Sequence, residues 1–400
     1  MTRLVIWCAL NFLFANAIKS SHMIFGELPK HLVPIHTGDD DLALVSSYTY
    51  VGITFQSTAR DIFTLHYKKK EAAAHHVAMM IFKKDGTFGT IDAVSLLRMY
   101  ASQVDPHLTF GCEVVVDVSR GLLRGLEGRQ ISFIRRTLGL NNKSSHAMLF
   151  FVTGVMPIYY RRIILRLRYF SYLLSLNDSS YASNALRENF ALFKDRESCW
   201  LGDIVITLRQ LSPPIILDNV AAVDGDAINL IIDRVRKHCS VTIHSQVNAN
   251  KTMPLLHRSD LPLDRPLRLQ TFLKEVYIPA HRRALTLLVT GCHRLAVVTG
   301  RWDEQARQER VCRLCRSGKV EDEKHALFEC MGCSDFMQSR ADFFHRIFPV
   351  WPGASRELRR LGGDAFIRRI IFGSNVDLLR ALARLAAKIY FLFVKKASVQ

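Results

Sequence analysis

Four residues near the C-terminus have the types and spacing of a metal site: Cys312, Cys315, His325 and Cys330, in the pattern C-x2-C-x9-H-x4-C. Two thiols separated by two residues form a tight turn that holds an ion from one side, and Gly318 helps the following loop to reverse. The histidine and the last cysteine can complete a tetrahedron. Three sulfurs and an imidazole favour zinc, and four protein ligands leave no open position. We therefore predict a structural zinc ion.

Other interpretations of this cluster stay open. Cys333 is an alternative fourth ligand in place of Cys330, and a chance cysteine pair with buried thiols is the simplest alternative. A thioredoxin-like redox pair is disfavoured because no βαβ pattern surrounds the cysteines. The chain has nine cysteines, and four of them lie between positions 312 and 333. An odd, clustered set favours metal ligation in a reducing compartment, so we expect an intracellular protein, nuclear or cytoplasmic.

The charge of the chain indicates its class of partner. Lys and Arg number 54 against 36 Asp and Glu, a net charge of +18. This imbalance favours RNA or DNA first and an acidic membrane surface second. Cations around the metal pattern are candidates for contacting phosphate, and the alternative is that they only decorate an exposed loop: Arg301, Arg313, Arg316 and Lys319.

The helical segment 157–176 mixes cations with aromatic rings. Its arginines are Arg161, Arg162, Arg166 and Arg168, and its rings include Tyr159, Tyr160, Tyr169 and Phe170. This combination suits RNA or single strands, where bases stack on rings and cations meet phosphates. An amphipathic helix with its aromatics in the core explains the same residues equally well. A second basic candidate is Lys68, Lys69 and Lys70, on the segment 60–82.

No segment has the composition of a membrane span. The best candidate, 378–394, carries Arg380, Arg384 and Lys388 at a spacing of four. That spacing places all three on one face of an amphipathic helix, whereas a span needs roughly 20 predominantly apolar residues.

The N-terminus allows another class of protein. Residues 1–17 have a charged start, an apolar run and small residues at 15–17, as a signal peptide has. A buried helix interrupted by Asn11 is the interpretation we prefer. A secreted or membrane-associated basic protein is therefore an alternative.

The predicted fold is mainly α with a small N-terminal β hairpin (α+β), multi-helix, with a zinc-bound C-terminal module. Residues 44–55, rich in Val, Tyr, Ile and Thr, indicate a strand or hairpin arm, and 20–25 a short strand. Helical spacing predicts helices over 1–17, 60–82, 91–104, 118–138, 144–151, 157–176, most of 180–240, 280–298, 335–348, 355–372 and 376–396.

Residues flanking the metal pattern resemble the C-terminal region of reverse transcriptases of non-LTR (LINE-type) retrotransposons. The resemblance is carried by 280–286, 293–296, Thr299-Gly300-Arg301-Trp302, Cys312–Cys315 and 320–330. In that family the fourth ligand is the cysteine after His-x-x-x-x, which favours Cys330 over Cys333. Weaker likeness extends to the N-terminal residues 7–26, the hairpin-like 48–55, and 139–140 with 153–157.

The resemblance implies a division of the chain. Residues 1–60 would be a remnant of the palm with a primer-grip-like hairpin, in which Gly52 lets a nucleic-acid backbone approach. Residues 61–245 would be a thumb-like and helical connection. A proline-containing linker over 246–270 would lead to the zinc-bearing domain 271–400.

The family's Tyr-x-Asp-Asp strand, which holds two divalent ions, has no counterpart here, and Asp39-Asp40-Asp41 reads as a solvated acidic turn. We therefore assign no catalytic residue, and Mg would belong only to a missing half. The expectation is a truncated retrotransposon fragment that binds zinc and RNA or DNA. The alternative is the C-terminal portion of an active RNA-directed DNA polymerase encoded in part elsewhere, with the rest of that enzyme as partner.

Overall fold

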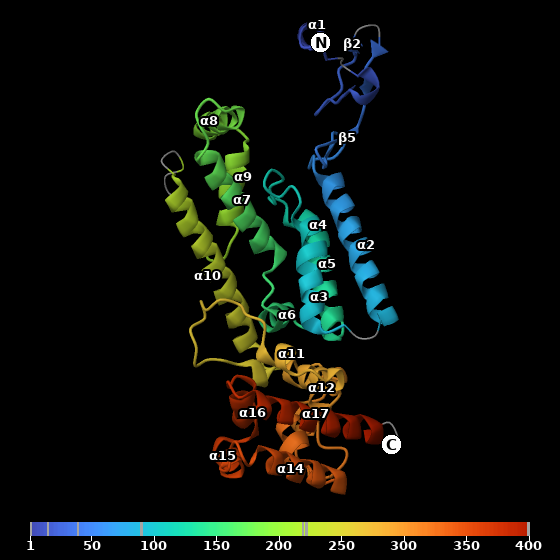
Figure 1. Cartoon of the computed structure of the whole chain (residues 1–400), viewed down its shortest axis with the longest axis vertical. Helices are drawn as coiled ribbons and strands as arrows, with labels where there is room; N and C mark the ends of the chain where they lie inside the picture. Colours follow the sequence, from blue (N-terminus) through green and yellow to red (C-terminus); the bar gives the residue numbers. More distant parts are fainter. Residues whose placement is uncertain are drawn as a thin grey trace. The chain divides into compact units, whose positions relative to one another are not determined.

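The computed structural model describes residues 2–13, 16–37, 40–88, 91–217, 220 and 223–397 (Figure 1). The chain is mostly helical with small two-stranded sheets near the N-terminus, which confirms the predicted fold class. Asp39, part of the acidic run, and Ala15 of the signal-like segment lie outside the described residues.

The chain divides into two compact units. Unit 1 comprises Met1–His76, Pro106–Arg129 and Leu165–Gly225, and unit 2 comprises Val77–Asp105, Gln130–Ile164 and Asp226–Gln400. Each unit thus combines segments that are distant in the sequence. Residues 246–270, the expected linker, belong to unit 2, where Leu255 and Leu256 are fully buried.

The strands of unit 1 form three pairs. These are β1 (Ser21–His22) parallel to β4 (Ala43–Leu44), β2 (His36–Thr37) antiparallel to β3 (Asp40–Asp41), and β5 (Ser47–Tyr50) antiparallel to β6 (Ile53–Gln56). The expected hairpin is therefore present over 47–56. Its turn residues Val51 and Gly52 have φ of 47° and 81°, the left-handed values that a two-residue type I′ hairpin requires.

The N-terminal helix α1 (Thr2–Leu10) is shorter than the expected 1–17 and is followed by η1 (Ala17–Lys19). Unit 1 also contains α8 (Tyr181–Lys194) and α9 (Trp200–Arg209). Four further helices divide between the units, α2 (Thr64–Phe88), α4 (Asp105–Thr109), α5 (Arg120–Leu138) and α7 (Ile158–Leu174), and the first residue of α10 (Gly225–Ala249) also belongs to unit 1.

The first helices of unit 2 are α3 (Ala93–Met99), the π-helical η2 (Tyr100–Val104), α6 (His146–Thr153), α10 (Gly225–Ala249) and η4 (Pro254–Leu256). The Asp92 side chain begins α3 by accepting hydrogen bonds from the N–H groups of Val94 and Ser95, as an N-cap does.

The C-terminal part of unit 2 is a helical cluster. It contains α11 (Thr271–Glu275), α12 (Pro279–Val289), α13 (Ala296–Thr299), η5 (Arg307–Glu309), η6 (His325–Glu329), α14 (Ser334–Ile347), α15 (Ala354–Leu361), α16 (Gly363–Ile371) and α17 (Val376–Ala397). The expected helix 280–298 is interrupted at Gly291, with φ 62°, and 355–372 is split at Gly362, with φ 77°.

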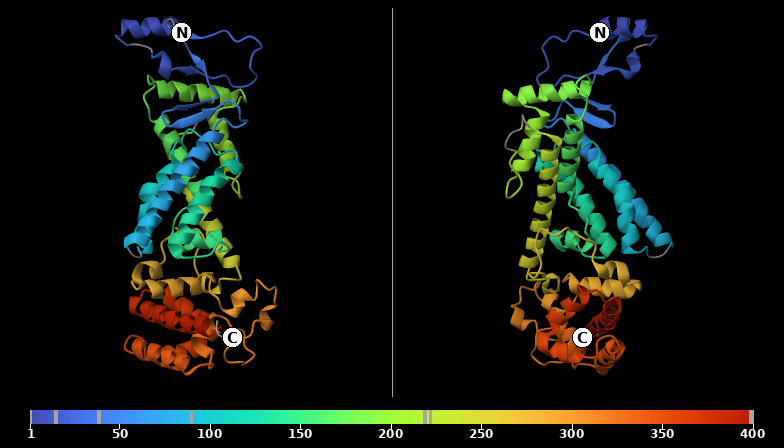
Figure 2. Two further views of the ribbon diagram at one scale, coloured as in Figure 1. Left: turned by 90° about the vertical axis from the view of Figure 1, so that its right-hand side faces the viewer. Right: turned by 60° about the vertical axis from the view of Figure 1, so that its left-hand side comes forward.

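Helix α17 is the centre of this cluster, and it lies between α12 and α14 in both figures (Figures 1 and 2). Its buried residues include Leu379, Leu382, Ala386 and Phe393, each at most 2% exposed, which share one side of the helix at spacings of three, four and seven. Burying a leucine side chain contributes about 1.5–3 kcal/mol, so this face anchors the metal-bearing segment that packs around it.

Candidate metal centre

The first two cysteines lie on a short hairpin-like loop. Val311 and Val320 form an antiparallel bridge, and the Cys312 N–H donates to the Lys319 carbonyl at 2.8 Å. Between them the chain reverses through Arg316 and Gly318, with φ of 49° and 70°. Gly318 therefore has the role expected from the sequence, because a glycine adopts positive φ without steric cost.

The other two ligands are separated by a π turn. The Cys330 N–H donates to the His325 carbonyl at 2.7 Å, five residues earlier in the chain. In an α-helix, residues four apart share a face, so this wider turn is what brings residues five apart together. The Asp322 carboxylate begins the turn by accepting the His325 N–H at 3.0 Å.

Buried Arg340 completes the turn. Its Nε donates to the Leu327 carbonyl at 2.8 Å, and its Nη2 donates to the Ala326 carbonyl at 3.2 Å. These carbonyls would otherwise lack the bonds of a regular helix, and a buried carbonyl without a partner is costly. A residue of α14 therefore holds the π turn in shape.

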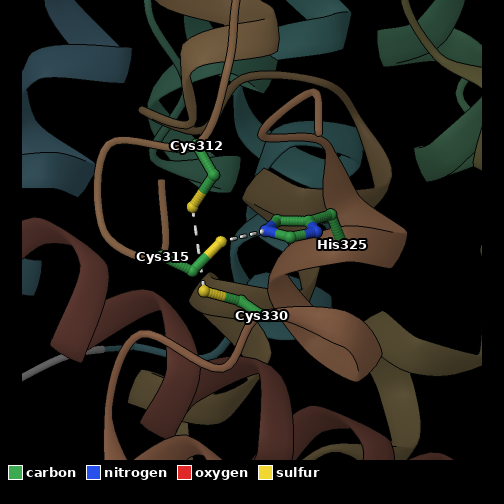
Figure 3. A group of neighbouring side chains, drawn as sticks. All are labelled: Cys312, Cys315, His325 and Cys330. Carbon is green, nitrogen blue, oxygen red and sulfur yellow. Dashed lines mark hydrogen bonds between the residues drawn. The ribbon is translucent and has the colours of Figure 1, made fainter. Parts of the chain in front are cut away.

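The four side chains converge on one point (Figure 3). Their ligand atoms all lie within 4.8 Å of one another, with Cys312 Sγ and Cys330 Sγ 3.7 Å apart and Cys315 Sγ and His325 Nε2 3.3 Å apart. In a tetrahedral zinc site with bonds of about 2.3 Å to sulfur and about 2.0 Å to nitrogen, the edges are about 3.8 Å and about 3.5 Å. The group could therefore hold a metal ion, and its three cysteines are free, with none of them in a disulfide.

Backbone N–H groups point at each of the three sulfurs. The donors include the residue two positions further on in each case, Leu314 for Cys312, Ser317 for Cys315 and Gly332 for Cys330, and Cys312 also accepts from the Cys315 N–H. Hydrogen bonds of this kind stabilise a thiolate, which is the form that binds a metal. The same local turn is thus repeated at all three cysteines.

The three thiols differ in acidity. Burial raises the pKa of Cys312 to about 12, against the backbone bonds that it accepts, and burial also raises the pKa of Cys330. Cys315 is more exposed; burial opposes ionisation there too, but bonds from the Ser317 hydroxyl and N–H outweigh it and lower the pKa of Cys315 to about 6. Cys315 is therefore the thiol most readily ionised.

The two halves of the group meet at a glycine. A Cβ on Gly332 would lie 2.7 Å from the Leu314 carbonyl carbon and 2.9 Å from the Cys315 nitrogen, both backbone atoms. Only a residue without a side chain lets these two segments approach so closely.

Three consecutive acidic residues, 321–323, bind the segments next to the metal group, and the sequence had not indicated this role. Glu321 accepts the Ala296 N–H at 2.9 Å and the Arg313 guanidinium at 2.6 Å, and Glu323 pairs with His293 at 2.8 Å. Burial alone would raise the pKa of Glu323, but the bond from His293 lowers it. The sequence feature that could have indicated these residues is the Glu-Asp-Glu run directly before Lys-His.

The second nitrogen of His325 faces a carboxylate. His325 Nδ1 is buried without a hydrogen-bond partner, and the Glu329 carboxylate, which pairs with Lys319 at 3.1 Å, has its Oε2 3.7 Å from this nitrogen. Metal-binding histidines commonly donate their other N–H to a carboxylate. Cys333, the alternative ligand, is outside the group, and its thiol instead lies 3.4 Å from the Asp335 carboxylate.

The predicted phosphate-binding residues near this loop have different environments. The Arg313 guanidinium is held by Glu321 and Lys319 by Glu329. Arg301 is half-buried, and burial lowers its pKa with a contribution from Arg310. Arg316 is exposed and takes part in no ion pair within the described ranges.

The four arginines of α7 do not share one surface. Arg162 and Arg166 are each 1% exposed, and Arg166 pairs with the buried Asp117 at 3.0 Å and donates to the Cys112 carbonyl at 3.0 Å. Arg161 pairs with Asp105 at 2.7 Å, and Arg168 is exposed. Assigning Arg162 and Arg166 to a nucleic-acid surface is therefore corrected, because both are core residues.

The hairpin region of unit 1 keeps its cations near the surface. Lys68 and Lys69 are exposed, and Lys69 Nζ donates to the Thr54 hydroxyl at 3.2 Å. The Lys70 ammonium lies 3.5 Å from the centre of the Phe110 ring, and burial, followed by repulsion from Lys69, lowers its pKa. Gly52 also meets this ring, since a Cβ there would lie 2.7 Å from Phe110 Cζ.

Among the described residues, no single helix combines the length and apolar composition of a membrane span. Helices α6 and α7 reach that length and composition only as a pair, which is bent by 60° at the junction.

The chain matches no protein-family model, no curated protein and no solved structure.

Proposed function

We propose that this chain binds a structural zinc ion through Cys312, Cys315, His325 and Cys330, and that the zinc-stabilised domain binds RNA or DNA. The observation that carries the proposal is the convergence of three sulfurs and one imidazole nitrogen at tetrahedral spacing. Zinc prefers this soft donor set, whereas magnesium and calcium prefer oxygen. Because all four positions are filled by protein, the ion would be structural.

Charge supports the nucleic-acid part of the proposal. The chain carries +18, and exposed cations lie close to the metal loop and beside the β5–β6 hairpin. A rigid loop that presents cations to phosphate loses little side-chain freedom on binding. We further propose an intracellular location, since a reducing compartment keeps thiols free to bind zinc.

The likeness to non-LTR reverse transcriptases supports descent from such an element. Segments that carry the likeness, including 293–296 and 320–330, are joined around the metal group by Glu321 and Glu323. We propose that the chain retains the zinc and nucleic-acid functions of that region and does not itself copy RNA.

Zinc content of the purified full chain tests the first part. We expect one zinc per chain in wild type, loss of that zinc in Cys312→Ser/Cys315→Ser, and retention in the matched control Cys333→Ser, whose thiol lies outside the group. Cobalt substitution should give thiolate charge-transfer bands in wild type and in the control. Well-folded wild-type protein that contains no zinc would refute the proposal.

RNA binding at two salt concentrations tests the second part. Binding through phosphate contacts weakens steeply as salt rises, with a slope in log K of about −0.7 per contact for a single strand. We expect such a slope for zinc-loaded wild type and weaker binding for the zinc-free variant. Binding that is absent, or insensitive to salt, would exclude a nucleic-acid function.

A further inference from the structure

A groove runs along α17 in the C-terminal helical cluster of unit 2. Its first hollow, of about 460 Å³, lies between α12, α14 and α17, and a further hollow of about 330 Å³ adjoins α14 and α17 towards Phe391. A small constriction lined by Arg346, Arg384 and Lys388 shares residues with both hollows. The basic stripe found in the sequence therefore lines a groove.

The floor of the first hollow is apolar. Val276, Ile347 and Ala381 contribute to it, and they are 2%, 2% and 4% exposed. Such a floor favours a flat or apolar group that leaves water on binding. The rim of this hollow is polar, because the charged side chains lie there.

The cations that line the groove exceed its acidic residues by one: Arg346, Arg380, Arg384 and Lys388 against Asp335, Asp342 and Asp377. Lys388 pairs with Asp342 at 3.1 Å, and Arg380 lies between Asp377 at 3.9 Å and Glu275 at 3.8 Å. Arg346 and Arg384 also line the hollow, and no ion pair involves either of them in the part of the chain that the structure describes. Two arginine forks are therefore available for an incoming anion.

An exposed aromatic ring stands at each end of the groove. Tyr277 is 67% exposed with the Arg380 guanidinium 4.5 Å from its ring centre, and Phe391 is 66% exposed. Positions 377–391 of α17 span about 21 Å, at about 1.5 Å per residue. Cations that lie between two exposed rings along such a length match the chemistry of a single strand, whose bases stack while its phosphates meet cations.

We propose that this groove binds single-stranded RNA or DNA, with Tyr277 stacking on a base and Arg346 and Arg384 contacting phosphates. The inference rests on the proposed nucleic-acid function and adds the strandedness and the residues. A base can enter the apolar hollow only when it is unstacked, so a duplex should bind the groove less well. An acidic protein segment is the competing occupant.

Fluorescence anisotropy with a labelled oligo(U) and with a duplex of equal length tests the proposal on zinc-loaded full chain. Arg346→Ala/Arg384→Ala should weaken oligo(U) binding about tenfold and reduce the salt slope by about 1.4, the value for two lost contacts. The matched control, Arg356→Ala/Arg359→Ala, removes two exposed arginines of α15 and should leave both quantities unchanged. Tyr277→Ala should weaken oligo(U) binding more than duplex binding.

The outcomes separate this inference from the proposed function. If Arg346→Ala/Arg384→Ala behaves as its control while Cys312→Ser/Cys315→Ser loses RNA, the groove inference is wrong and the proposed function stands. If wild type binds no RNA, the proposed function itself fails. Poly-glutamate that competes as well as unlabelled oligo(U) at equal charge would assign the groove to acidic protein segments. Arg346→Lys/Arg384→Lys, which keeps both charges, should retain most of the affinity and guards against misfolding.

Discussion

Arg340 is a buried cation beside a group of thiols. It is 8% exposed; burial lowers its pKa, and the charges of Cys330 and Glu329 act in the opposite direction. Three thiolates with one divalent ion carry a net charge of about −1. Arg340 would therefore balance the charge of the loaded centre as well as hold the π turn.

Replacing this arginine tests that role. Arg340→Leu should weaken zinc binding by about 10- to 100-fold, the usual effect of losing a group that supports metal ligands. Competition with a chromophoric chelator measures the affinity. Arg356→Leu, which removes an exposed arginine elsewhere in unit 2, is the control. An unchanged affinity in Arg340→Leu would show that Arg340 has no part in the site.

The different acidities of the cysteines predict how many protons zinc displaces. Near neutral pH, Cys312 with a pKa of about 12 and Cys330 with a raised pKa are protonated before the metal binds, whereas Cys315 with a pKa of about 6 is already ionised. Binding should therefore release about two protons from the thiols. Calorimetry in buffers of different ionisation enthalpy gives the number, and about three would contradict the lowered pKa of Cys315.

At the scale of elements, the approach of the two metal-binding segments depends on Gly332. Gly332→Ala should weaken zinc binding and reduce stability by about 1–3 kcal/mol, because its Cβ would meet backbone atoms that have to move. Gly353→Ala is a matched control, since nothing lies within 4 Å of a Cβ there. Thermal unfolding of both variants decides the point, and similar melting temperatures would argue against close packing at Gly332.

Helix α7 contrasts a buried with an exposed arginine. Arg166→Leu removes the buried Arg166–Asp117 ion pair, at 3.0 Å, from a carboxylate that also accepts the Tyr67 hydroxyl at 2.6 Å, so stability should fall by about 3–5 kcal/mol. Arg168→Leu should change stability by less than about 0.5 kcal/mol. Urea unfolding measures both. Equal effects would mean that the Arg166–Asp117 pair does not stabilise the fold.

The sequence predicted the ligand set and the hairpin better than it predicted the burial and the ion pairs of side chains. The ligand set and the hairpin were accessible because both depend on local spacing and on glycines. The burial of Arg166 was not, because its partner Asp117 is 49 positions away and no local pattern distinguishes a paired arginine from a solvated one. The breaks at Gly291 and Gly362 were missed because apolar spacing continues across them.

At the scale of the whole molecule, the metal group belongs to one unit only. Removing zinc with a chelator should increase hydrogen exchange over 311–347 and leave the Arg166 region of unit 1 protected, because the binding energy of the ion stabilises the segment that it joins. Exchange measured by mass spectrometry locates the effect. Uniform loss of protection across both units would show that the chain unfolds as one cooperative body.

The sequence also did not indicate that each unit combines separate stretches of the chain. The predicted divisions at 60, 245 and 270 followed chain order, whereas each observed unit is assembled from three separate stretches. Proline-rich composition marks irregular backbone, but it cannot report whether that backbone is packed, as Leu255 and Leu256 are.

The π turn between His325 and Cys330 fixes the number of residues that separate these two ligands. Removing one residue would restore α-helical spacing and direct the last sulfur elsewhere. Residues 316–319, by contrast, are exposed, and their contacts with the metal group come from the Ser317 hydroxyl, 3.1 Å from Cys315 Sγ, and from the Lys319 carbonyl, which accepts the Cys312 N–H. Over evolutionary time, insertions and deletions should therefore accumulate between Cys315 and the buried Glu321 and be eliminated between His325 and Cys330. Divergent descendants would keep H-x4-C invariant while the preceding gap drifts in length.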